Sequence, residues 1–173
     1  GSYDMYYGSG IDSCFDFQFA SQDGLIAGVL NGKSNAGAAQ YAKKCQSIQE
    51  QFGQYNANYI NAPFYANHDM GRSAGYYAGE TGVAKTKIGH AMNLLMSGSA
   101  FLYYGEELGM KGSGKDENKR LGMMWYEDKS AEGMCDGPKA ADAVKQKYDS
   151  LELQAQDPAS VYNYVKQVLK VRN

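Results

Sequence analysis

Hydrophobic and polar positions follow two different periods along this chain. Strand-like runs, alternating or continuously apolar, occur at residues 11–17, 62–67 and 100–104. Apolar residues recur every three or four positions at 36–52, from about 81 to 97, and in the last 16 residues, which predicts helices. The order strand, helix, strand, helix, strand, helix is typical of βαβ units with parallel strands, so the predicted class is α/β.

The ends of these predicted helices carry recognisable signals. In the last helix, Asp157 is the expected N-cap and Pro158 the expected first helical residue. Gly98 is placed to stop the middle helix. A brief helix is expected at 24–30, and another short one around 141–151, inside a long polar segment at 108–156.

Composition narrows the class of partner. The chain has 173 residues, 43% of them hydrophobic, and a formal net charge of −2, which predicts a single domain, 1–173, with a sizeable core. Acidic and basic residues are interspersed, which argues against the clustered basic face of a nucleic-acid-binding protein. No apolar run reaches the roughly 20 residues of a membrane span. Two distant histidines and three cysteines without metal-type spacing predict no transition-metal site.

Three polar residues end the strand-like run at 62–67. Asn67, His68 and Asp69 follow an apolar stretch directly, and the carboxyl ends of parallel strands are where ligands bind in α/β proteins. A plain turn is the alternative, because Asn and Asp are favoured where strands stop. The cluster is therefore a candidate site by position.

Two acidic residues end the run at 100–104. Glu106 and Glu107 could suggest an acid/base couple. On an extended chain, however, adjacent side chains point to opposite sides, so we interpret them as structural. The following residues, Gly109 to Lys115, partly match a phosphate-binding loop, but Asp116 stands where a Mg²⁺-binding Ser or Thr is needed and no helix pattern follows. A nucleotide site is therefore disfavoured.

Several motifs, taken in order, resemble the C-terminal part of the catalytic domain of the α-amylase family of retaining α-glycoside hydrolases. They are YYGSGIDSCFDFQFA, FYANHD followed by Met70-Gly71-Arg72, AFLYYGEELGM, then Asp116, Arg120, Met123 and Trp125, and the closing VLKVRN. The resemblance covers nearly the whole chain and is far more specific than a lone Asn-His-Asp. The 15 tyrosines, with flat apolar faces and polar hydroxyls, suit sugar rings.

The resemblance implies a partial (β/α)8 barrel, with the three strands as strands six to eight together with their helices. A complete barrel needs about 250 residues, so we expect the last three-eighths of one. The family's nucleophile, an Asp after strand four, and its general acid/base, a Glu after strand five, have no counterpart in this sequence. No cofactor is expected in this chain, and calcium in the parent would be held mostly by the missing part.

The resemblance also implies roles for the strand-tip residues. Asp69 would be the family's third carboxylate, which stabilises the oxocarbenium-like transition state, while His68 and Asn67 would bind hydroxyls of the same sugar and Arg72 would shape the rim of that subsite. Because retaining hydrolysis needs two further carboxyl groups about 5–5.5 Å apart, the chain alone is expected to be inactive.

Other expectations concern partners and location. The expected ligand is an α-linked oligo- or polysaccharide, with no nucleic acid and no membrane. Open edges of a three-stranded sheet are expected to drive self-association. A secreted or cell-surface bacterial enzyme is favoured over a cytoplasmic one. The alternative is a non-catalytic carbohydrate-binding or interaction domain on the same fold, since fold does not fix function.

Overall fold

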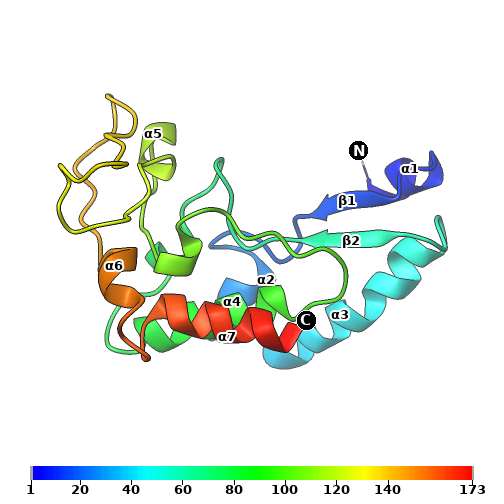
Figure 1. Ribbon diagram of the computed structural model, residues 1–173. Coiled ribbons are helices and arrows are strands. Elements are labelled where there is room, and N and C mark those ends of the chain that lie inside the picture. The colour runs from blue at the N-terminus through cyan, green and yellow to red at the C-terminus, as the bar shows by residue number, and fades with distance from the viewer. Residues whose placement is uncertain (1, 173) are drawn as a thin grey trace.

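The computed structural model describes residues 2–172, and its two parallel strands lie side by side above helix α3 (Ala38–Gly53) in Figure 1. Strand β1 (Ser13–Asp16) pairs with β2 (Ile60–Pro63), with Ser13 opposite Ile60 and Asp16 opposite Pro63. Parallel strands near 11–17 and 62–67 are therefore confirmed, but β2 begins two residues earlier and ends four residues earlier than the predicted strand.

The third predicted strand is reduced to a single bridge. Phe101 N donates to Pro63 O at 2.8 Å, and Phe64 pairs with Phe101 in parallel fashion. No further strand flanks the 100–104 segment among the described residues, so nothing on its outer side regularises it into a full strand. The prediction of a strand at 100–104 was right about direction and neighbour but wrong about length.

Helices cover one side of the strands, and most of them lie where periodicity placed them. Figure 1 shows α2, α3, α4 and α7 gathered on that side, with α1 beside the start of β1. The helices are α1 (Tyr3–Gly8), α2 (Leu25–Leu30), α3 (Ala38–Gly53), α4 (Gly82–Leu94), α5 (Asp116–Lys119), α6 (Leu151–Gln154) and α7 (Val161–Arg172), with 3-10 turns η1 (Ser73–Gly75) and η2 (Glu106–Leu108).

The core lies between these helices and the strands. Ile26 of α2, Phe52 of α3 and Tyr65 after β2 belong to one buried cluster, and Leu94 of α4 packs with Val165 of α7 in a second. Burying these side chains is the main favourable contribution to the fold, at roughly 25 cal/mol per Å² of apolar surface. The core thus packs against β2 and the residues directly after it, and the chain becomes exposed only at His68 and Asp69.

The last helix begins later than its sequence signal suggested. Asp157 Oδ1 accepts a hydrogen bond from Ala159 N at 2.8 Å, which makes a turn, and Pro158 lies in that turn. The helix starts at Val161, where Ser160 Oγ accepts from Asn163 N at 3.1 Å. Ser160 is therefore the N-cap, and the assignment of Asp157 was wrong by three residues.

The helix expected at 141–151 does not form. Asp142 N donates to Asn118 Oδ1 at 2.7 Å, and Gln146 bonds both the N–H and the carbonyl of Lys111. These contacts to distant backbone and side chains replace the local hydrogen bonds of a helix. Instead, α5 and α6 form near the two ends of the longer segment 108–156. Because α5 directly follows the glycine-rich loop 109–115, the expectation that no helix follows this loop was wrong. Over residues 2–172, no helix is long and apolar enough to span a membrane.

Candidate functional site

The candidate site lies where the chain leaves β2. Phe64, Tyr65 and Ala66 are buried, and then His68 and Asp69 are exposed. Asp69 N donates to Asn67 Oδ1 at 2.9 Å, a turn held by an asparagine side chain. The turn and the site are therefore the same structure, and Asn67 keeps its side-chain NH₂ free for another partner.

Opposite charges meet at Asp69. Its Oδ1 lies 3.4 Å from His68 Nε2 and 3.5 Å from Arg120 Nη2, and 67% of its side chain is exposed. Lys119 Nζ donates to the Asp69 backbone carbonyl at 2.9 Å. At this exposure the Arg120–Asp69 ion pair contributes only about 0–1 kcal/mol to stability. The arrangement therefore leaves a carboxylate available to a ligand, with donors beside it.

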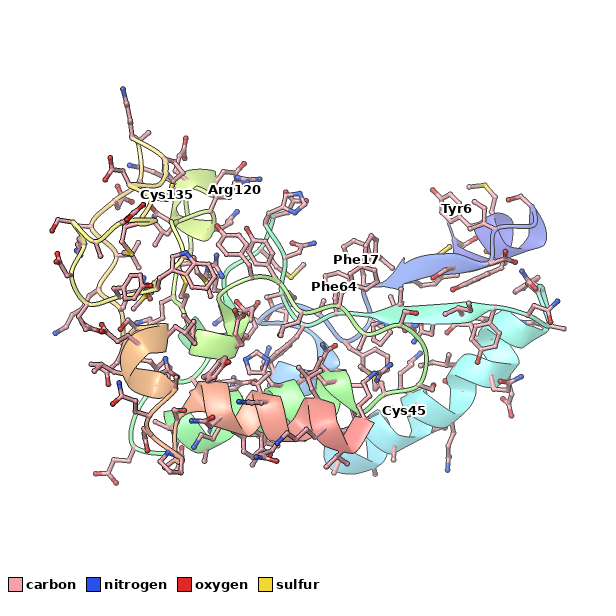
Figure 2. The ribbon with its side chains drawn as sticks, in the orientation of Figure 1. Tyr6, Phe17, Cys45, Phe64, Arg120 and Cys135 are labelled. Atoms are coloured by element: carbon pink, nitrogen blue, oxygen red, sulfur yellow. The ribbon has the colours of Figure 1, made fainter. Side chains whose placement is uncertain are left out.

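An aromatic hollow adjoins this cluster on the helix-free side of the strands. Its volume is about 220 Å³, and Figure 2 shows Phe17 and Phe64 projecting on that side. Asn67 and His68 line the hollow together with apolar side chains; its apolar residues are Phe15, Phe17, Phe64, Ala66, Phe101 and Leu102, with Tyr103 at its edge. An apolar wall beside hydrogen-bonding side chains suits a ligand with apolar faces and polar edges, such as a sugar.

Arg72 lies beneath the tip and not on its rim. None of its side chain is exposed, so no direct contact with a sugar is available to it in this arrangement. Its Nη1 donates to Tyr104 O at 2.7 Å and lies 3.7 Å from Glu106 Oε1. The expectation that Arg72 shapes the rim is corrected, because the chain turns inward after Asp69.

Glu106 is structural in this arrangement, although not for the reason given by an extended chain. Glu106 and Glu107 lie in the 3-10 turn η2, and Glu106 is buried with Ser73 N and Oγ donating to its Oε2. Burial raises the pKa of Glu106 to about 7, while Ser73 and Arg72 act in the opposite direction. Its partners are protein groups, so it is not presented to a ligand.

Neither a metal site nor a nucleotide site emerges from the described geometry. Across residues 2–172, no three His, Cys, Asp or Glu side chains gather as metal ligands would. The calcium implied for the parent therefore has no donor set to test here. Asp116, in the would-be phosphate loop, pairs with Lys119 and Arg120 and offers phosphate a negative charge.

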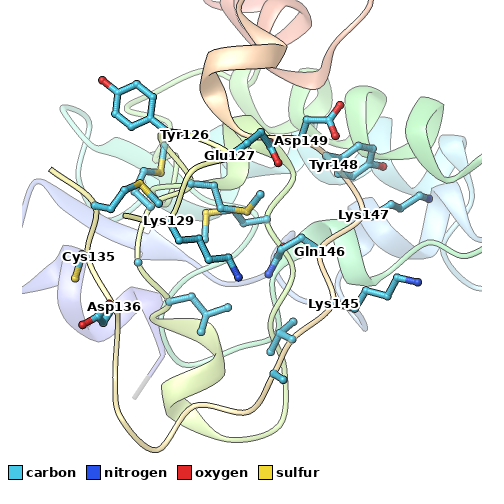
Figure 3. Close-up of a pocket in the computed structure, with 18 of the residues that line it drawn as sticks. Tyr126, Glu127, Lys129, Cys135, Asp136, Lys145, Gln146, Lys147, Tyr148 and Asp149 are labelled. Atoms are coloured by element: carbon cyan, nitrogen blue, oxygen red, sulfur yellow. The ribbon is translucent and has the colours of Figure 1, made fainter. Parts of the chain in front are cut away.

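A larger cavity lies elsewhere, in the irregular segment between α5 and α6 (Figure 3). Its volume is about 740 Å³, and methionines, both acidic and basic side chains, and Tyr126 and Tyr148 line it. None of Asn67, His68 and Asp69 takes part. The cavity therefore is not part of the strand-tip site.

Sequence reasoning missed two residues of the site. Arg120, labelled in Figure 2, and Lys119 both contact Asp69, yet they follow it by about 50 positions. The available signal was the pair Asp116 and Arg120, four residues apart, which form an ion pair at 3.3 Å. The resemblance contains both residues in its motifs but implies no role for either.

Known proteins resemble this chain over its whole length. The family model described as "Alpha amylase, catalytic domain" matches residues 3–173. Amy13B of Eubacterium rectale is 54% identical with a TM-score of 0.95, and the match covers 99% of this chain and 33% of that one. An α-amylase of H. orenii is 27% identical with a TM-score of 0.76, over 100% and 34%. Alpha-amylase 3 of Dictyoglomus thermophilum is 27% identical over 96% of this chain and 32% of its own length.

These matches define both membership and extent. The chain spans about a third of the length of the relatives just named. The family model matches nearly every residue. The chain therefore belongs to the α-amylase catalytic-domain family, and it corresponds to a small α/β part of that family's TIM barrel.

Proposed function

We propose that this chain forms one wall of the sugar-binding cleft of a retaining glycoside hydrolase that acts on α-linked glucans. The observation that carries the proposal is the exposed cluster of Asn67, His68 and Asp69 at the carboxyl end of a parallel strand, beside an aromatic hollow. In this proposal the strands are the sixth, seventh and eighth of a (β/α)8 barrel. Active sites of such barrels are built from the loops at this end.

Each residue of the tip has a separate role in the proposal. Asp69 accepts hydrogen bonds from sugar hydroxyls and stabilises the positive charge of an oxocarbenium-like transition state. His68 and the free NH₂ of Asn67 donate to hydroxyls of the same ring. Arg120 offers a second cation close to Asp69. In a complete barrel the phenylalanines on the helix-free side of the strands would fill its packed interior beneath the site, so the sugar contacts are assigned to the tip residues.

The proposal includes inactivity of the chain by itself. Retaining hydrolysis needs a nucleophile and a general acid/base about 5–5.5 Å apart, and Asp69 serves in neither role. The sequence holds no counterpart of the two family strands that carry them. Residues outside this chain are proposed to supply both groups, along with any calcium. A secreted or cell-surface location is proposed for the parent protein.

A non-catalytic carbohydrate-binding or interaction domain is the second candidate. It shares the fold and the sugar contacts, and it differs only in lacking the two missing carboxylates. A longer protein that contains this chain decides between them: both carboxylates upstream support an enzyme, and loss of either supports a binding protein. The exposed carboxylate of Asp69 favours the enzyme, since a scaffold has no physical need for it there.

The test is binding and hydrolysis by the 173-residue chain. We expect maltohexaose to bind with a Kd in the millimolar range by NMR titration, as suits half a site. The isosteric change Asp69→Asn should weaken binding about tenfold or more, because hydrogen bonds to charged groups are the strong ones. Asp128→Asn, on an exposed turn away from the site, is the matched control.

Two results would count against the proposal. Equal affinity of wild type and Asp69→Asn would remove Asp69 from the sugar site. Measurable turnover of a chromogenic α-glucoside by the chain alone would show that it carries its own nucleophile and acid. Cellohexaose, with β-linkages, should bind more weakly than maltohexaose.

A further inference from the structure

A connected set of buried charged side chains and two more exposed tyrosines lies directly beneath the strand-tip site. Arg72 and Glu106 have 0% and 2% of their side chains exposed, and Ser73 is also fully buried. A buried ion pair adds little net stability, because desolvation of both charges offsets their attraction. The role of this pair is therefore better inferred from the residues that it holds in place than from its contribution to stability.

Glu106 fixes the chain just after the tip. Its Oε2 accepts from Ser73 N at 3.2 Å and from Ser73 Oγ, while its Oε1 faces Arg72 Nη1 at 3.7 Å. The carboxylate thus bonds one residue of the turn and faces the guanidinium of its neighbour. Arg72 is in this way directed away from solvent and towards the 103–106 segment.

Arg72 in turn clamps two tyrosines. Its Nη1 donates to Tyr104 O at 2.7 Å, and its guanidinium carbon lies 4.7 and 4.8 Å from the ring centroids of Tyr103 and Tyr104. Gly105 makes this approach possible, because its φ is +79° and a Cβ there would lie 3.2 Å from Arg72 Nη1. A planar cation held against two rings is a contact that Lys does not reproduce.

The hydroxyls of the two tyrosines reach the segment that carries Arg120. Tyr103 Oη donates to Lys119 O at 3.2 Å, and Tyr104 Oη donates to Leu121 O at 2.7 Å. These carbonyls belong to the residues immediately before and after Arg120. The two tyrosine hydroxyls therefore hold the backbone on both sides of Arg120. We call Arg72, Glu106, Tyr103 and Tyr104 together the clamp.

This segment meets the sugar-binding tip. Arg120 Nη2 lies 3.5 Å from Asp69 Oδ1, and Lys119 Nζ donates to Asp69 O at 2.9 Å. The Tyr103 ring also lies 6.5 Å from the His68 ring, centroid to centroid, and borders the aromatic hollow. Two loops far apart in sequence thus come together at Asp69 above one clamp.

We infer that Glu106 and Arg72 are positioning residues, which hold the two tyrosines so that their hydroxyls keep Arg120 directed at Asp69. The inference rests on the proposed function in one respect, because it assigns Arg120 to the same sugar site. It adds a specific cause for the geometry of that site: two buried charged side chains, the half-buried Tyr103 and the 40% exposed Tyr104 set the distance between a cation and a carboxylate. None of the four needs to touch the sugar.

The sharpest variant removes the two hydroxyls and keeps both rings. Tyr103→Phe/Tyr104→Phe should shift the Nε–Hε resonance of Arg120 and weaken maltohexaose binding about fivefold to tenfold, the loss expected when one charge-assisted hydrogen bond from Arg120 is weakened. Tyr55→Phe should change neither, because Tyr55 is exposed and lies between α3 and the start of β2, the end of the strand opposite the tip. Near-UV circular dichroism checks that each variant stays folded.

A double-mutant cycle tests the route through Arg120. In an Arg120→Ala background, loss of the hydroxyls should have no further effect on maltohexaose binding, because the group that they position is gone. Glu106→Gln should shift the Arg120 resonance in the otherwise wild-type chain, and Glu152→Gln, exposed on α6, should not. A merely structural role would lower the unfolding temperature without moving that resonance.

The outcomes separate the inference from the proposed function. If the wild type binds no maltohexaose, the proposed function fails. The shift of the Arg120 resonance in the hydroxyl-free variant then still tests whether the tyrosines position Arg120. If the hydroxyl-free variant keeps the wild-type resonance and affinity, the clamp is overturned while the sugar site stands. If affinity falls equally with and without Arg120, the tyrosines act by another route, and the inference is likewise overturned.

Discussion

Glu106 Oε1 lies 3.7 Å from Arg72 Nη1, and both side chains are sealed from solvent. Within residues 2–172, Nε and Nη2 of Arg72 have no hydrogen-bond partner, so Glu106 and the two tyrosine rings are the main compensation for burying that cation. Removing one member of such a pair typically costs about 3–5 kcal/mol, because an unpaired charge stays behind. The underside of the strand tip is thus sensitive to single substitutions.

Arg72→Met is therefore expected to lower the free energy of unfolding by roughly 3 kcal/mol. Urea unfolding at pH 8, where Glu106 is mostly ionised in the wild type, measures the change. The matched double variant Arg72→Met/Glu106→Leu should recover part of the loss, because it leaves no charge unpaired. A single variant as stable as the wild type would show that the pair is open to water.

The Glu106 carboxyl predicts one pH dependence of stability. Burial raises its pKa from the ordinary 4.5 to about 7, against the opposing effects of Ser73 and Arg72. A raised pKa stabilises the fold below pH 4.5, and that contribution is lost as the pH rises towards about 7. Relative to the wild type, Glu106→Gln should therefore gain in Tm between pH 4.5 and 7 and change little above. A Tm difference that is constant with pH would contradict this.

A second buried titratable group, His90 on α4, predicts the opposite slope. Burial lowers the pKa of His90 from 6.5 to about 4, and neither ring nitrogen has a hydrogen-bond partner within the described residues. Its contribution is present above pH 6.5 and is lost as the pH falls towards about 4. His90→Leu should therefore gain in Tm relative to the wild type on acidification through this window. Between pH 7 and 8 the difference should be constant, which is the internal control.

Local periodicity predicted the elements that the core holds in place. The helices at 36–52 and 81–97 are confirmed, because their apolar faces meet the buried clusters around Phe52 and Leu94. The strand at 11–17 is confirmed as well, but Phe15 and Phe17 on its apolar face are exposed, and it meets the core through Cys14. The prediction of a helix at 141–151 was wrong, because Asp142 forms hydrogen bonds with Asn118, 24 residues away, in place of local ones. A local pattern carries no record of such distant hydrogen bonds.

The position of the site could be predicted from the sequence, but the burial of Arg72 and the contact of Arg120 with Asp69 could not. An apolar run ending in His68 and Asp69 located the exposed tip, because strand ends meet solvent. The burial of Arg72 depends on Glu106 and two tyrosines more than 30 residues downstream, and nothing next to Arg72 signals it. The contact of Arg120 with Asp69 is equally non-local, and it became apparent only from the fold.

The open aromatic face predicts association of the chain with itself. Phe15, Phe17 and Phe101 are 51%, 58% and 47% exposed, and all three line the aromatic hollow. Apolar clusters of this kind, next to unpaired strand edges, favour pairing with another chain. We therefore expect a concentration-dependent dimer in sedimentation velocity, and Phe15→Ser/Phe17→Ser should weaken it at least tenfold, or about 1.4 kcal/mol. Tyr55→Ser, equally exposed but distant, should leave it unchanged, and a wild-type chain that stays monomeric at high concentration would refute the prediction.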